Sequence, residues 1–186
     1  MKSLQTAASV ATIAILFLLI PSGLRAAQNP DSAAVSQLLQ SVKTHAANAE
    51  DDAATLASFT RSTLDKRHHG VQLNMIREHI NNLIRDGNEL NSKRDEGSPW
   101  QQQAIDHIVQ LLPVMADHLT ATITYLNEHP NHVNLKPFQD YVLANETLIH
   151  NAHDIISAYV EYGEAKAKSE TLEKNLRLPP AAEPTA

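Results

Sequence analysis

Proline and glycine divide this chain into long stretches suited to helices. Eight of the nine prolines lie near the N-terminus, at the ends of apolar-periodic stretches or in the last ten residues, and Pro113 alone falls inside such a stretch. Proline disrupts a helix interior but is tolerated at its first turn. No Asn-Gly or similar hairpin dipeptide joins two runs rich in β-branched residues. The chain is therefore predicted to be all-α.

Four helices are expected, at about residues 32–59, 69–96, 99–128 and 136–176. In each, apolar or small residues recur with alternating spacings of three and four, which is typical of an amphipathic helix. Ser98-Pro99-Trp100-Gln101 is a strong helix start, since Ser98 and Gln101 can form a capping box. Short connections favour an antiparallel up-and-down four-helix bundle over residues 28–177, with coiled-coil-like packing. Residues 178–186 are expected to be a disordered tail.

The N-terminal residues 1–27 read as a signal peptide. Lys2 precedes an apolar run from Ala7 to Ile20, and small residues at Ala26 and Ala27 suit cleavage near that point. The expected location is therefore exported, either periplasmic or secreted. An uncleaved membrane anchor over residues 4–24 is the alternative, although a spanning helix needs about 20 apolar residues.

The charge of the chain bears on its possible partners, and its cysteine content bears on how the fold is stabilised. The whole chain has 15 Lys and Arg against 21 Asp and Glu, and removing residues 1–26 takes away Lys2 and Arg25, which leaves a formal charge of −8. Such an acidic chain is not expected to bind nucleic acid. There is no cysteine, so packing rather than disulfides must stabilise the fold.

Ten histidines are the one unusual feature of the composition. Aligning the predicted helices from their ends brings His68, His69, His129 and His132 to one end of the bundle. Four neutral imidazoles there could bind Zn, Cu or Ni. The alternative is that these are ordinary surface histidines of a loop region.

A second group of polar residues falls about ten residues further in. His79 and His118 share one layer, with Asn145 nearby on the apolar seam of the last helix. This set is predicted to be a buried polar layer that fixes the register of the helices. A b-type haem held by histidines or methionines is the competing interpretation, but the last helix offers neither residue on its seam.

Three segments resemble parts of exported bacterial helical-bundle proteins of unassigned function. They are Ser98 to Asp106, Tyr125 to Glu128 and Tyr159 to Lys166. The resemblance would span about residues 31–176. It implies bacterial export and a helical bundle, and it transfers no catalytic residue.

We therefore expect a non-enzymatic, exported bundle that acts through contacts with another envelope or secreted protein or with itself. The sequence has no H-E-x-x-H, no G-x-S-x-G and no phosphate-binding glycine loop. A metal- or haem-binding bundle that uses the histidines is the alternative, and a small-ligand sensor module is the third possibility. A membrane contact is expected only if the N-terminal segment is retained.

Overall fold

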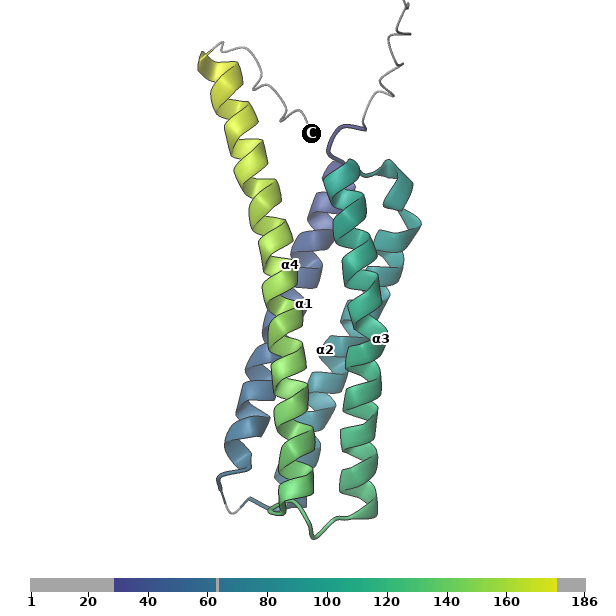
Figure 1. Cartoon of the computed structure of the whole chain (residues 1–186), viewed down its shortest axis with the longest axis vertical. Coiled ribbons are helices and arrows are strands. Elements are labelled where there is room, and N and C mark those ends of the chain that lie inside the picture. The colour runs from purple at the N-terminus through teal and green to yellow at the C-terminus, as the bar shows by residue number, and fades with distance from the viewer. Residues whose placement is uncertain (1–28, 63, 177–186) are drawn as a thin grey trace, which may run out of the picture.

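The computed structural model describes residues 29–62 and 64–176. Four long helices account for most of them: α1 (Ala33–Phe59), α2 (Lys66–Ser92), α3 (Pro99–Glu128) and α4 (Lys136–Leu176). A short 3-10 turn, η1 (Arg94–Glu96), joins α2 to α3. Figure 1 shows the helices running up and down side by side. The predicted signal peptide, and residues 178–186 of the predicted tail, lie outside the described residues.

Each helix packs on its neighbours in the chain, and α1 also packs on α4, which closes the ring of four. The prediction of an all-α, up-and-down four-helix bundle is thus confirmed. Within the part of the chain that the structure describes, no helix is both long enough and apolar enough to cross a membrane.

The core lies on the seams that the 3-4 spacing predicts. On α1 the buried positions include three alanines, Ala46, Ala49 and Ala53, which let neighbouring helices approach closely. Larger side chains from the other helices fill the space between them, including Ile76, Leu83, Ile108 and Ile149. Alternating small and large side chains gives the interdigitated packing that a bundle needs.

Helix α2 begins at Lys66, three residues before the expected start at 69. The reason is a cap: the Asp65 carboxylate accepts hydrogen bonds from the backbone N–H groups of Arg67 and His68. Asp is among the residues that cap helix N-termini best. At its other end the α-helix stops at Ser92 and η1 covers the remaining residues to Glu96.

Gln101 joins the starts of α1 and α3. Its side chain is fully buried, and its Oε1 accepts hydrogen bonds from the backbone N–H of Ser98 at 3.0 Å and of Ser32 at 2.8 Å. Its Nε2 donates to the Ser32 carbonyl and to Ser36 Oγ. The predicted capping residue therefore serves two helices, because Ser32 is the N-cap of α1.

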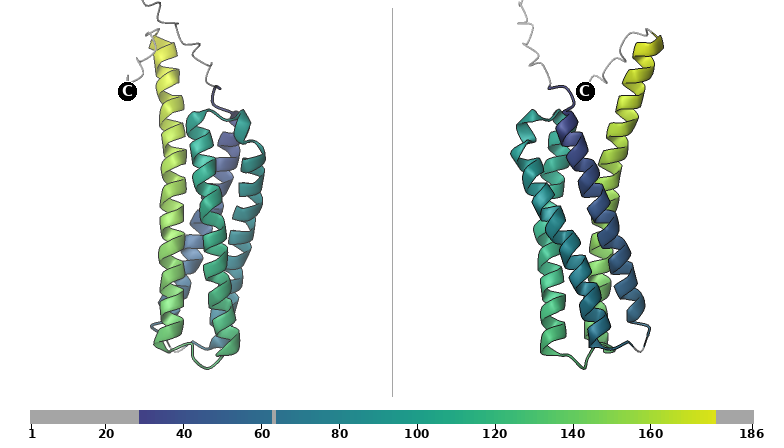
Figure 2. Two further views of the ribbon diagram at one scale, coloured as in Figure 1. Left: turned by 45° about the vertical axis from the view of Figure 1, so that its right-hand side comes forward. Right: turned by 180° about the vertical axis from the view of Figure 1, so that it is seen from behind.

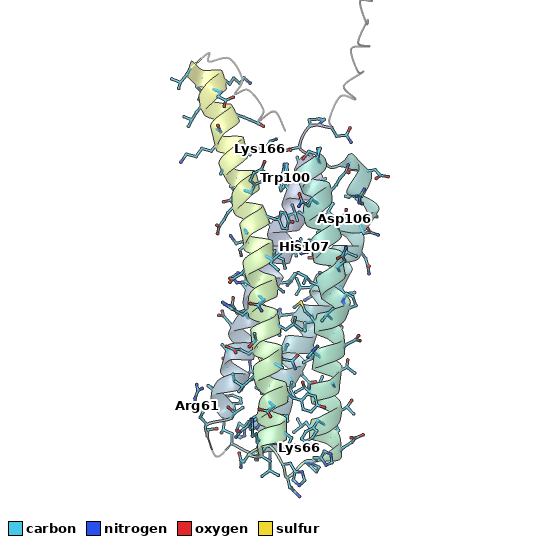
Figure 3. All side chains as sticks on the ribbon, viewed as in Figure 1. Arg61, Lys66, Trp100, Asp106, His107 and Lys166 are labelled. Carbon is cyan, nitrogen blue, oxygen red and sulfur yellow. The ribbon has the colours of Figure 1, made fainter. Side chains whose placement is uncertain are left out.

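Trp100 extends the same junction to α4. Its indole N–H donates to Asp31 Oδ1 at 2.8 Å, and Lys166 of α4 donates to Asp31 Oδ2 at 2.8 Å. Gly163 lies under the indole, since a Cβ there would be 2.7 Å from Trp100 Cη2. Figure 3 labels Trp100 and Lys166 near the point where α4 passes the end of the other helices. We call Asp31, Trp100, Gln101, Gly163 and Lys166 the end junction.

Replacing Gln101 by Ala should lower the free energy of unfolding by about 2–4 kcal/mol, because it leaves several buried backbone groups without partners. Gln102→Ala is the matched control, since the Gln102 side chain donates one hydrogen bond, to the Gly97 carbonyl, and its loss should cost less than about 1 kcal/mol. Urea denaturation followed by circular dichroism measures both. Equal losses for the two variants would contradict the assigned role of Gln101.

Candidate interaction face between α3 and α4

Helix α4 is longer than the bundle that it belongs to. It has 41 residues, whereas α1 and α2 have 27 each and α3 has 30. At 1.5 Å per residue α4 spans about 61 Å and the others about 40–45 Å. Figures 1 and 2 show its C-terminal part projecting past the other helices. Ala167 still borders α1, and among the described residues 168–176 none is buried; we call these the overhang.

A second stripe of mainly apolar residues runs along α4 beside its core seam. Its spacing also alternates between three and four, and it continues into the overhang. The α4 stripe consists of Ala144, Leu148, Asn151, Ile155, Ala158, Tyr162, Ala165, Ser169, Leu172 and Leu176. Tyr162 is 53% exposed, Leu172 51% and Leu176 64%. Single exposed apolar residues are normal on a protein surface, whereas a row of them along one helix is a candidate interaction site.

Two hollows between α3 and α4 are lined by this stripe. One of about 550 Å³ is bordered by Trp100, Gln103 and His107 of α3 and by Ile155, Ala158, Tyr159 and Tyr162 of α4. The other, of about 430 Å³, lies nearer the opposite end of the bundle, where His118 faces Ala144, Leu148 and Asn151. The two hollows and the stripe form one face, which we call the α3/α4 face.

The wider hollow has an ordered aromatic wall. The rings of Trp100 and Tyr162 meet edge to face with centroids 5.3 Å apart, and His107 Nδ1 lies 3.2 Å from the Tyr159 hydroxyl. Figure 3 labels Trp100 and His107 on α3. Aromatic side chains held in place by such contacts lose little conformational entropy when they bind a partner. The wall therefore suits a protein contact.

His68 and His69, two of the four histidines predicted to bind a metal, have separate environments. His69 is buried between Phe59 and Phe138, with ring centroids 5.7 and 5.4 Å away, and its Nδ1 lies 2.9 Å from the Asp65 carbonyl. His68 is exposed, with its Nδ1 2.8 Å from Asp65 Oδ1. His69 thus belongs to the core, and a sequence pattern alone does not separate it from its exposed neighbour.

His129 and His132 do lie together, with nearly parallel rings and centroids 5.3 Å apart. Imidazole lone pairs lie in the ring plane, so stacked rings do not direct them at a common ion. Over residues 29–62 and 64–176, no group of three or more His, Cys, Asp or Glu side chains is placed to hold a metal ion.

The predicted polar layer is assembled only in part. Asn145 is buried, and its Nδ2 donates to Thr122 Oγ1 and to the backbone carbonyls of Tyr141 and His118. The His118 side chain itself is exposed and borders the α3/α4 face. His79 is half-buried, and its Nε2 lies 3.4 Å from Asp52 Oδ2 of α1. Thr122, which the sequence pattern does not single out, supplies the side-chain partner of Asn145.

Helix α1 carries acidic and histidine side chains that pair with both of its neighbours. Glu50 lies between His150 and His153 of α4, with each carboxylate oxygen 2.5 Å from one Nδ1. On the other side of α1, His45 lies 3.7 Å from the buried Asp86 of α2. These pairs had no signal in the sequence beyond the high histidine content, because each joins helices far apart in the chain.

Comparison with protein-family models, with curated proteins and with solved structures gave no significant match. The resemblance to exported bacterial bundles stays a prediction.

The pKa of His150 should lie above its usual value of 6.5, because Glu50 accepts a hydrogen bond from the ring and Asp154 adds a favourable charge. A raised histidine pKa stabilises the fold below pH 6.5, and this contribution is lost as the pH rises through the folded-state pKa. Titration of the imidazole Hε1 signals by NMR measures it. In Glu50→Gln the His150 pKa should fall towards 6.5, whereas an unchanged value would contradict the pairing.

Proposed function

We propose that this chain is a non-enzymatic, exported helical bundle that acts through protein contacts made at the α3/α4 face. The observation that carries the proposal is the apolar α4 stripe, which continues from the bundle into the overhang. Among the described residues of the overhang none is buried, so this extension gains little from packing within the bundle, and helices in proteins are stabilised mainly by packing of their apolar face. A partner that covers the stripe would supply that packing.

The composition of the face supports a protein partner. Protein interfaces are enriched in aromatic side chains and have apolar centres with polar rims. The wider hollow is lined by the aromatic side chains of Trp100, Tyr159 and Tyr162 and by the polar side chains of Gln103 and His107. The wider hollow lies between α3 and α4, and a hollow between two helices can accept an amphipathic helix of a partner. Export is part of the proposal and rests on the predicted signal segment.

The double variant Leu172→Glu with Leu176→Glu should abolish or weaken the contact. Both side chains are exposed on the overhang, so folding should be unaffected, while two carboxylates would have to be desolvated in the interface. Size-exclusion chromatography with light scattering, together with pull-down from a bacterial envelope extract, measures self-association and partner binding.

Val71→Glu is the matched control, because Val71 is an exposed aliphatic residue of α2, 56% accessible and outside the α3/α4 face. It should leave association and partner binding unchanged. A wild-type chain that is monomeric and retains no partner would contradict the proposal, as would association that survives the double variant.

A further inference from the structure

The α4 stripe is complementary to itself when read in the opposite direction. Residues at equal distances on either side of Val160 form pairs of stripe positions. Ala158 pairs with Tyr162, and Ile155 with Ala165; further out, Leu148 pairs with Leu172 and Ala144 with Leu176. The remaining pair, Asn151 with Ser169, matches the two polar positions of the stripe. Every position of the stripe has its counterpart in this reading.

Three of these five pairs set a large side chain against alanine. Facing helices pack best when large and small side chains alternate across the contact, because this fills the space without strain. A parallel arrangement would instead set each residue against its own copy, with Ala158 on Ala158 and Asn151 on Asn151. The size pattern therefore favours two α4 helices packed antiparallel, with the spacing of a left-handed coiled coil.

The charges beside the stripe fit the same arrangement. Asp154, with 63% of its side chain exposed, would lie close to Lys168 of the second copy, offset by two residues along the helix. The two-fold symmetry provides this contact twice. Glu161 would face its own copy near the axis, a repulsion reduced by Lys43, whose Nζ is 3.8 Å from the Glu161 carboxylate. The two attractive Asp154–Lys168 pairs outnumber the one Glu161 pair, whose repulsion is partly neutralised. The charges therefore favour the antiparallel arrangement.

In this arrangement the overhang also contacts the second copy. Residues 168–176 of one copy would lie opposite residues 144–152 of the other, where His118, Leu148 and Asn151 border the hollow of about 430 Å³. The paired segments run from Ala144 to Leu176, about 50 Å of helix.

We propose that the partner of the α3/α4 face is a second copy of this chain, bound with the α4 helices antiparallel about a two-fold axis at Val160. This inference rests on the proposed function and adds the partner, the direction and the register to it. The isologous contact closes after two copies, as in most homodimers. The overhang of each copy covers residues 144–152 of the other, and the middle parts of the two stripes cover each other.

Disulfide cross-linking tests the register, because the chain has no cysteine of its own. Asn151→Cys and Ser169→Cys are made as separate full-length variants, at two exposed positions of the stripe. They are oxidised alone and as an equal mixture, and covalent dimers are followed on a non-reducing gel. In the proposed dimer the thiol of the Asn151→Cys variant faces the thiol of the Ser169→Cys variant, while identical positions lie 18 residues, about 27 Å, apart. The mixture should cross-link at least about tenfold faster than either variant alone.

Other outcomes would overturn the inference. Cross-linking of each variant with itself, without a gain on mixing, would indicate a parallel dimer, and cross-linking of Ser169→Cys alone would indicate contact through the overhangs only. A wild-type dimer whose variants do not cross-link would place the interface elsewhere. A monomer by light scattering rules out the second copy. If that monomer still retains an envelope protein through Leu172 and Leu176, the proposed function stands without this inference; if it retains none, both fail.

Discussion

The buried amide of Gln101 and the indole of Trp100 beside it fix the relative positions of α1, α3 and α4 at one end of the bundle. Gln101 bonds the N-terminal residues of α1 and α3, and Trp100 reaches Asp31, which also holds Lys166 of α4. Sliding α4 by one turn would break the Lys166 contact and move Gly163 away from the indole. The end junction therefore determines where α4 leaves the bundle and how much of it becomes overhang.

Helix α4 is held unequally by its two neighbours, and this leaves the α3 side open. Towards α1 it makes polar contacts along its length, through Glu50 with His150 and His153 and through Gln40 with Glu164. Towards α3 the polar contacts of the described residues include Asn145 with Thr122 and Tyr159 with His107. The contacts with α1 fix the direction in which the α4 stripe points.

The fold could be predicted from the sequence because the signals for it are local. A 3-4 spacing of apolar residues specifies a helix and its buried side, and the capping box at Ser98 and Gln101 marks a helix start within four residues. The site could be predicted only in part. Whether a histidine such as His69 or His118 faces the core depends on small rotations of packed helices, and spacing does not resolve them. The sequence pattern of residues 136–176 indicates the core seam of the helix, whereas the stripe beside it has a similar period and fewer large side chains and does not stand out.

Two adjacent stripes on one helix have a physical consequence for the whole molecule. A helix that buries one stripe in its own bundle covers an arc of little more than 100°, so a second row of apolar residues next to it must face a groove or solvent. In α4 the core seam ends near Gly163, where the other helices end, yet the second stripe continues to Leu176. Packing of the bundle core does not require aliphatic side chains at Leu172 and Leu176, because both lie beyond the core. The pattern is explained when something outside the bundle packs against the same row from Ala144 to the end of the helix.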